Sequence, residues 1–185
     1  MSRTSVKFSI YRLTTLALLI ACLQTSRFLF SFLPNVQPIT VLLILITLTF
    51  GLIDGLIVAA GTMLVSNLVL GMGPWTFAQI GAYAVIVLLT YIADHLMIGK
   101  TVRYLFWLLF SGCTGLLYGL LISILQAPIL GLSFSGLIGY WIAGLWFDGY
   151  HAAGNIGFFI ILYPTVTPIF QKVSDKLNSS KQRNH

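Results

Sequence analysis

The stretch Phe50-Gly51-Leu52-Ile53-Asp54-Gly55 divides an apolar run that extends from residue 39 to residue 70. As a single helix with a rise of about 1.5 Å per residue, these roughly 32 residues would measure about 48 Å, which exceeds the ~30 Å hydrocarbon core of a membrane. The two glycines and the only carboxylate of the run permit a tight turn at a membrane surface. The run therefore predicts two helical spans, about residues 38–51 and 53–70.

The composition is typical of an integral membrane protein. Of the 185 residues, 58% are hydrophobic and only 8% are charged, and the mean hydropathy is +0.96. The net charge of +6 does not indicate a nucleic-acid partner, because the ten basic residues cluster at the ends of the predicted spans. Cys22 and Cys113 lie inside apolar segments and are interpreted as small hydrophobic residues, so we expect no disulfide, metal site or cofactor.

Further spans follow on both sides of the central run. Three basic residues lie at the beginning of the first span, as in a signal peptide, but its length and the lack of a small-residue cleavage site favour a retained helix. Prolines 34 and 38 and the turn Gly71-Met72-Gly73-Pro74-Trp75-Thr76 separate successive spans. The sequence predicts a single all-α membrane domain of six transmembrane helices. The four remaining spans are about residues 9–30, 76–97, 104–126 and 149–170.

Residues 129–147 are apolar and almost long enough to form a seventh span. Six spans place nine basic residues, from both termini and from the connector near residue 100, on the cytoplasmic side, and leave only Arg27 near the other face. We therefore expect a multi-pass protein of the cell membrane with both termini cytoplasmic, in which residues 129–147 form a re-entrant or interfacial segment. Residues 172–185 are expected to be a basic tail that contacts anionic lipid. Pro164 and Pro168 should kink the last span.

Three polar side chains mark the beginning of the predicted last span. Asp148, His151 and Asn155 stand at positions i, i+3 and i+7 of one helical face. Polar groups in a membrane cost free energy unless something binds them. One interpretation is a ligand site. The other is structural: Asp148 and His151 cap the last helix, and Asn155 bonds a neighbouring span.

The predicted topology brings polar residues from three connectors to the outward side. Gln79 and Tyr83, at i and i+4 of one helix, face the same way. Two kinds of candidate have a structural alternative to ligand binding. Trp75, Trp141 and Trp146 suit an interfacial belt, and Arg27 suits a helix end that contacts lipid headgroups. The candidate ligand-binding residues are Arg27, Asn35, Gln37, Asn67, Trp75, Gln79, Tyr83, Trp141, Trp146, His151 and Asn155.

These features together resemble the substrate-binding S components of energy-coupling factor transporters, which capture vitamins and related micronutrients in prokaryotes. The resemblance covers most of the chain and rests on its six-span size with both termini inside. It rests also on the AxxxA motif Ala17-Leu18-Leu19-Ile20-Ala21, on Pro34-Asn35-Val36-Gln37-Pro38-Ile39-Thr40, on Phe50-Gly51-Leu52-Ile53-Asp54-Gly55, on Gly71-Met72-Gly73-Pro74-Trp75-Thr76, and on Asp148-Gly149-Tyr150-His151 to Asn155.

The resemblance implies how such a chain works. Ala17 and Ala21 would contact the transmembrane coupling subunit, and two separate ATPase subunits would supply energy, so this chain would be a transport subunit and not an enzyme. The Asn-Val-Gln-Pro and Met-Gly-Pro-Trp turns look most like the corrinoid branch of the family, which implies cobalamin as the ligand. Arg27 equally suits the carboxylate of pantothenate or of another small vitamin.

Two other classes of function compete with this one. The first is a membrane enzyme or proton-coupled carrier that uses Asp148 and His151, and the second is a structural membrane protein without a ligand. Only four acidic residues occur in the whole chain, which leaves little from which to build a catalytic centre. No nucleotide-binding glycine loop and no convincing internal repeat is found, and their absence disfavours an ATPase and a secondary carrier respectively.

Overall fold

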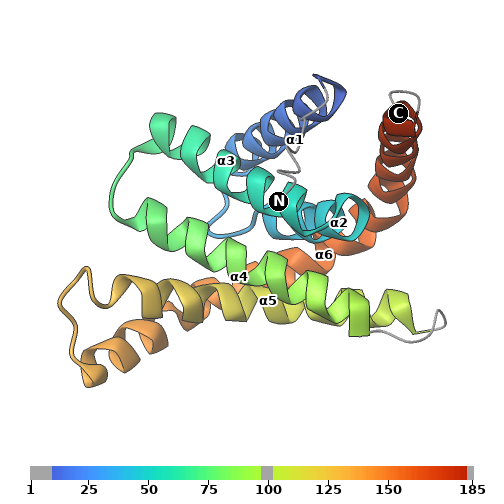
Figure 1. The fold of residues 1–185 in the computed structure, drawn as a ribbon. Coiled ribbons are helices and arrows are strands. Elements are labelled where there is room, and N and C mark those ends of the chain that lie inside the picture. The colour runs from blue at the N-terminus through green and yellow to red at the C-terminus, as the bar shows by residue number, and fades with distance from the viewer. Residues whose placement is uncertain (1–9, 97–101, 183–185) are drawn as a thin grey trace, which may run out of the picture.

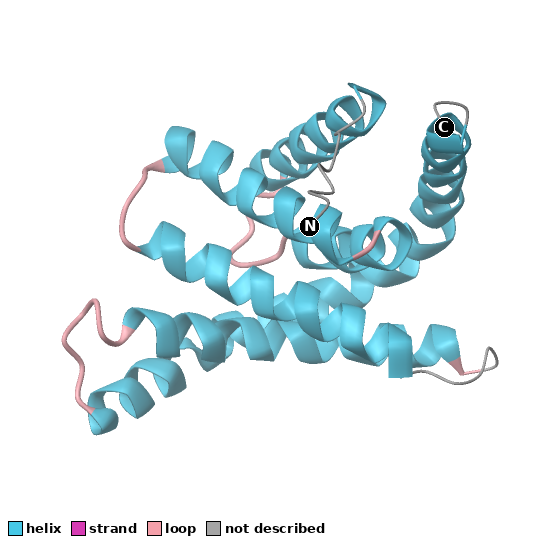
Figure 2. Cartoon of the chain, in the orientation of Figure 1, coloured by secondary structure: helices cyan, strands magenta, loops and turns pink. Residues whose placement is uncertain are grey.

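The computed structural model describes residues 10–96 and 102–182, and this part of the chain contains helices and no strand. Figures 1 and 2 show the helices packed into a bundle, with short loops between them. The predicted all-α class is confirmed. The helices are α1 (Ile10–Leu29), α2 (Ile39–Phe50), α3 (Leu52–Leu70), α4 (Trp75–Leu96), α5 (Arg103–Gln126) and α6 (Phe134–Gln182).

The predicted break in the central apolar run lies at Gly51. This residue has φ +91° and ψ 179°, a conformation that favours glycine, and it separates α2 from α3 without any further loop residue. Its backbone N–H donates to the carbonyl of Thr47 at 3.0 Å, which ends α2 with a hydrogen bond. The two helices therefore meet at a sharp corner, as the glycines predicted.

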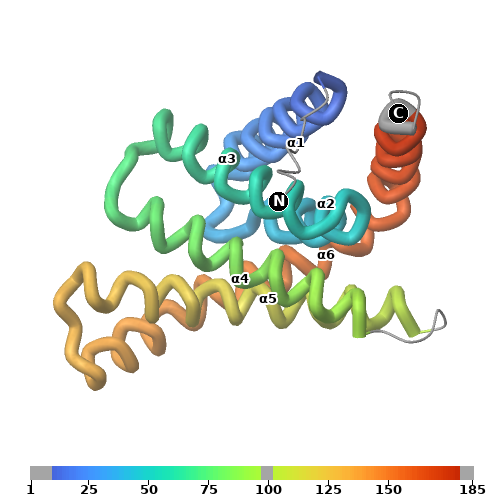
Figure 3. The backbone as a smooth tube through the Cα atoms, in the orientation of Figure 1, coloured from blue at the N-terminus to red at the C-terminus, as the bar shows by residue number. Residues whose placement is uncertain are grey.

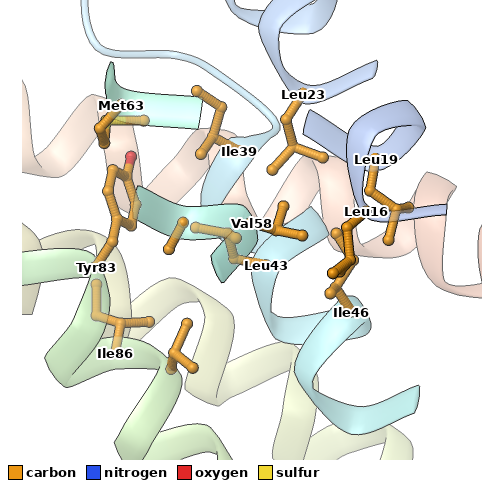
Figure 4. Packing of buried hydrophobic residues seen from close by; sticks show 12 residues of the cluster. Leu16, Leu19, Leu23, Ile39, Leu43, Ile46, Val58, Met63, Tyr83 and Ile86 are labelled. Atoms are coloured by element: carbon orange, nitrogen blue, oxygen red, sulfur yellow. The ribbon is translucent and has the colours of Figure 1, made fainter. Parts of the chain in front are cut away.

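Helix α2 forms the centre of the bundle. Eight of its 12 residues are buried, and it contacts all five other helices. Leu43 and Ile46 belong to a core cluster shared with α1, α3 and α4, part of which is shown in Figure 4. Val41 and Ile44 belong to a second cluster with residues of α5 and α6. The two clusters share α2, so this short helix joins the two halves of the bundle.

Four of the described helices are long and apolar enough to cross a membrane by length and composition: α3, α4, α5 and α6. Helix α1 has 20 residues and includes Arg12 and Arg27. Helix α2, with 12 residues, measures about 18 Å and is too short to cross alone. The α3–α4 and α5–α6 connectors lie at one end of the bundle, on the left in Figure 1, whereas α4 ends and α5 begins at the opposite end.

The prediction for the end of the chain was wrong at one boundary. Residues 134–147 do not form a segment separate from a last helix at 149–170, because α6 is continuous from Phe134 to Gln182 and includes the first part of the predicted tail. Glycine costs a helix only about 1 kcal/mol per residue, so the glycines of this stretch do not break it. The turn lies earlier, at Pro128 and at Gly131 with φ +65°.

The prolines of α6 have the predicted effect. Figure 3 shows the helix turning between its orange part and its red part, and Pro164 and Pro168 occupy this region of the sequence. A proline inside a helix removes one backbone hydrogen bond and clashes with the preceding turn, so the helix axis bends there.

Glycines bring α5 and α6 into close contact. A Cβ atom at Gly115 would lie 2.5 Å from the backbone nitrogen of Ala152, and one at Gly119 would overlap the carboxylate of Asp148. Gly112 similarly faces Ile156 at 2.9 Å. These glycines allow close packing along this face of α5, and that packing fixes the position of α6 beside the candidate site.

Candidate functional site

An internal cavity of about 80 Å³ lies among α1, α3, α4, α5, α6 and the loop that joins α1 to α2. Six of the predicted ligand-binding residues line it. Met63 and Tyr118, which the sequence reasoning missed, complete the lining. The eight lining residues are Arg27, Asn35, Gln37, Met63, Gln79, Tyr83, Tyr118 and His151.

Arg27 contributes the only cationic side chain among the described residues that line the cavity. It lies in the last turn of α1, and its Nη1 donates to Ser66 Oγ at 2.5 Å and to Met63 Sδ at 3.3 Å. Its Nε is buried and has no hydrogen-bond partner within residues 10–96 and 102–182. The cavity therefore contains a guanidinium whose hydrogen-bonding capacity is only partly used.

The loop between α1 and α2 closes one side of the cavity. Asn35 has φ +58°, and its Nδ2 donates to the carbonyl of Phe147 on α6 at 2.9 Å. The next residue, Val36, packs against Gly154, where an added Cβ would lie 3.0 Å from Val36 Cγ1. The loop is thus held against α6 at two adjacent positions, and this contact places the side chains of Asn35 and Gln37 at the cavity.

His151 occupies the α6 side of the cavity and is only 3% exposed. Its Nε2 lies 2.8 Å from Thr40 Oγ1 in the first turn of α2, whereas its buried Nδ1 has no partner in the described residues. The ring contacts Tyr118 edge to face, with centroids 5.1 Å apart. One ring nitrogen is therefore held in place by the fold, and the other is buried without a partner in the described residues.

The side chains of two tyrosines line the cavity next to each other. The rings of Tyr83 on α4 and Tyr118 on α5 lie 4.7 Å apart. Figure 4 shows the hydroxyl of Tyr83 directed toward Met63 on α3. Aromatic faces and hydroxyl groups of this kind suit an organic ligand that is partly apolar and partly polar.

Asn67 supports the cavity without lining it. Its Nδ2 donates to Gln79 Oε1 at 2.7 Å and to Thr76 Oγ1 at 3.0 Å, and the residue is 2% exposed. With its oxygen engaged in this way, Gln79 presents its NH₂ group as the remaining donor. Trp75 begins α4, packs over Gly73 and is 46% exposed, so it also lies outside the cavity.

Three predicted residues of α6 do not reach the cavity. Trp141 stands ten positions before His151 in the same helix, which separates the two by about 15 Å along the axis. Trp146 is 79% exposed. Asn155 is fully buried and donates through Nδ2 to the carbonyl of Ser111 at 3.0 Å, so it joins α6 to α5. Its role agrees with the structural interpretation of this residue.

Asp148 has neither of the two roles considered from sequence. It lies within α6 and not at a helix start, so it caps no helix, and its carboxylate packs against Gly119 of α5. It does not line the cavity with His151. Within the described ranges, no group of three or more His, Cys, Asp or Glu side chains is placed to hold a metal ion. The cavity offers hydrogen-bond donors, one cation and aromatic surface, which are the groups of a binding site.

Searches among protein-family models, curated proteins and solved structures found no match to this chain. Of the two lining residues that were missed, Tyr118 had a signal in the sequence, since it is a hydroxyl-bearing residue within a largely apolar helix. Met63 had none, because methionine is common in any apolar helix.

Proposed function

We propose that this chain is a membrane-embedded subunit that captures a small micronutrient for import, as do the S components of energy-coupling factor transporters that it resembles, and that the cavity is its ligand site. The observation that carries the proposal is the meeting of six predicted polar residues at one internal cavity from α1, α4, α6 and the α1–α2 loop. Buried polar groups without partners are costly unless a ligand binds them.

The exposed side chains support a place in the membrane. Large apolar residues cover the outer faces of the long helices, among them Leu68, Phe77, Leu109 and Ile161, each more than half exposed. In water such a surface would be unfavourable, whereas lipid tails accommodate it. The proposal keeps both termini in the cytoplasm, as the distribution of basic residues predicts.

Helix α1 offers a surface to a partner subunit. Leu16, Leu19 and Leu23 bury one face of this helix in the core, and Ala17 and Ala21 are exposed on its outer side. Small residues at i and i+4 let another helix approach closely. We assign this surface to the transmembrane coupling subunit, which would act with two ATPase subunits.

The volume of the cavity favours a small ligand. An apolar cavity of about 150 Å³ binds benzene, and pockets for drug-sized ligands measure about 300–1,000 Å³. A cavity of about 80 Å³ therefore fits part of a small vitamin. Cobalamin, the first choice from sequence, would require a far larger displacement of the α1–α2 loop than pantothenate or a vitamin of similar size.

The proposal is tested by identifying what the protein binds. Mass spectrometry of ligand released from gently purified protein, followed by calorimetry with a panel of vitamins, should identify a ligand. Gln79→Ala should weaken its binding and abolish uptake in cells, because Gln79 lines the cavity. Trp146→Ala is the matched control, since this residue is exposed outside the cavity and should leave both unchanged.

If no vitamin binds, and Gln79→Ala leaves cell growth on limiting micronutrient unaffected, the chain is not a capture subunit. That pair of results would favour a structural membrane protein.

A further inference from the structure

We infer that the ligand is a small organic acid whose carboxylate binds to Arg27. This inference rests on the proposed function, because it names the chemical class of molecule that the cavity receives. Its basis is the contrast between Arg27 and the other arginines of residues 10–96 and 102–182.

Each of those other arginines has a carboxylate partner. Arg12 on α1 forms an ion pair with Asp54 on α3, and Arg103 at the start of α5 forms one with Asp94 near the end of α4, at 2.6 Å. Arg27 bonds only neutral groups, the hydroxyl of Ser66 and the sulfur of Met63. The fold has thus neutralised two arginines by internal pairing and has left the charge of Arg27 facing a cavity.

No acidic side chain of the chain is placed to neutralise Arg27. All four acidic residues fall within the described ranges. Asp54 and Asp94 have the partners named above, Asp148 packs against Gly119 of α5, and Asp175 is exposed in the C-terminal part of α6. The cavity lining contains no carboxylate. A partly buried cation without a counter-ion is costly, and an anionic ligand would remove that cost.

The free edge of the guanidinium has the shape that a carboxylate needs. Both hydrogen bonds of Arg27 leave from Nη1, and neither Nε nor Nη2 bonds any described residue. Nε and Nη2 together form one side of the guanidinium plane, from which two parallel N–H groups bind the two oxygens of a carboxylate. The internal contacts therefore hold the side chain in place and spare its bidentate edge.

A second, independent group points to a ligand in the same cavity. The side chain of His151 lines the cavity and is only 3% exposed. Its Nδ1 atom has no hydrogen-bond partner in the described residues. The amides of Asn35, Gln37 and Gln79 add neutral donors and acceptors. A ligand with a carboxylate at one end and hydroxyl or amide groups beyond it would use both kinds of partner.

The test compares acids with their neutral analogues on the detergent-purified full chain. The probes are pantothenate against pantothenol, biotin against biotin amide, and nicotinate against nicotinamide, with cobalamin as a large ligand that has no carboxylate. We expect one acid to bind, and its neutral analogue to bind about tenfold to a hundredfold more weakly, as for the loss of hydrogen bonds to a charged group. This comparison needs no variant.

Variants then assign the preference to Arg27. Arg27→Gln should reduce affinity for the acid about tenfold or more and abolish the preference over the neutral analogue, whereas Arg27→Lys should retain part of it. Arg103→Gln is the matched control, because it removes the same charge from a residue outside the cavity lining and should leave the acid preference unchanged.

The outcomes separate the inference from the proposed function. If cobalamin or a neutral analogue binds as tightly as any acid, or if Arg27→Gln retains the preference for the acid, the inference is overturned and ligand capture stands. If none of these probes binds and no acid is released from the purified protein, the inference is overturned as well. Failure of the proposed capture function is recognised by a different result, which is unchanged uptake in the Gln79→Ala variant.

Discussion

At the scale of the residue, Gly119 shows how closely two helices of this protein approach. An added Cβ would overlap the carboxylate of Asp148, a buried group that cannot move freely between α5 and α6. We expect Gly119→Ala to destabilise the protein by about 1–3 kcal/mol, as overpacking of a core does. The midpoint of thermal unfolding in detergent measures this.

Gly144 is the matched control for that substitution. It lies in α6 with no atom within 4 Å of an added Cβ. Gly144→Ala should leave stability unchanged or raise it by up to about 1 kcal/mol, because alanine is the better helix former. Equal effects of the two substitutions would show that the contact between Gly119 and Asp148 does not limit the packing.

Thr40 holds His151 through the single hydrogen bond of that ring, at 2.8 Å. Thr40→Val keeps the shape of the side chain but leaves both ring nitrogens without a partner, so we expect a loss of about 1–3 kcal/mol in stability. Thr165→Val is the control, since Thr165 is exposed and bonds only backbone carbonyls of its own helix. Ligand affinity should fall with Thr40→Val alone, and calorimetry measures it. Unchanged affinity would mean that the ring does not contact the ligand.

At the scale of the element, the α1–α2 loop has contacts that make it the closing side of the cavity. Asn35 combines φ +58° with a side-chain hydrogen bond to the carbonyl of Phe147. Asn35→Gly preserves the backbone conformation and removes only the hydrogen bond, whereas Asn35→Ala removes the bond and adds backbone strain. Both should speed amide hydrogen exchange in residues 31–38, the alanine variant more so.

Ligand dissociation gives the functional measure of the same contact. If the loop must leave α6 before the ligand escapes, Asn35→Gly should raise the dissociation rate and leave the exchange of α2 unchanged. An unchanged rate would place the route of the ligand elsewhere.

The elements also show which features a sequence can predict. The corner at Gly51 was predicted because a continuous apolar run of that length has few ways to fit a membrane, and only one place in it offered two glycines and a carboxylate. The start of α6 was not predicted, since glycines among aromatic residues suit a broken helix and a continuous one equally well. Only the packing of α6 on α5 and the turn at Gly131 decide between them.

The structure also separates the predicted residues that line the cavity from those that do not. Arg27, Gln79 and His151 were found because polar groups in apolar helices are costly and therefore have a use. Trp141 and Trp146 were placed in the site by the assumed break before Asp148, and the continuous helix carries them away from it. Whether an amide contacts ligand or another side chain, as with Asn155 and Ser111, depends on distances that no sequence pattern contains.

At the scale of the whole molecule, the proposed ligand site and the proposed partner surface occupy different parts of the bundle. The cavity lies inside, beneath the α1–α2 loop, whereas Ala17 and Ala21 are exposed on the outer side of α1 and are not among its lining residues. A transport subunit of the proposed kind must bind ligand alone and deliver it only with its partner. The two surfaces should therefore be separable by mutation.

A bulky residue on α1 tests that separation. Ala17→Trp or Ala21→Trp should abolish uptake or complex assembly, because an indole group prevents the close approach of another helix, while ligand binding by the isolated chain stays within about twofold of the wild type. Ile161→Trp is the control, since Ile161 is also an exposed apolar position, on α6, and should tolerate the larger ring. Calorimetry on the purified chain and uptake in cells measure the two properties independently. If binding and uptake fall together, the alanines serve the fold of α1 itself. If neither changes, the coupling subunit contacts another face of the bundle, and the proposed partner surface is wrong while the cavity remains the ligand site.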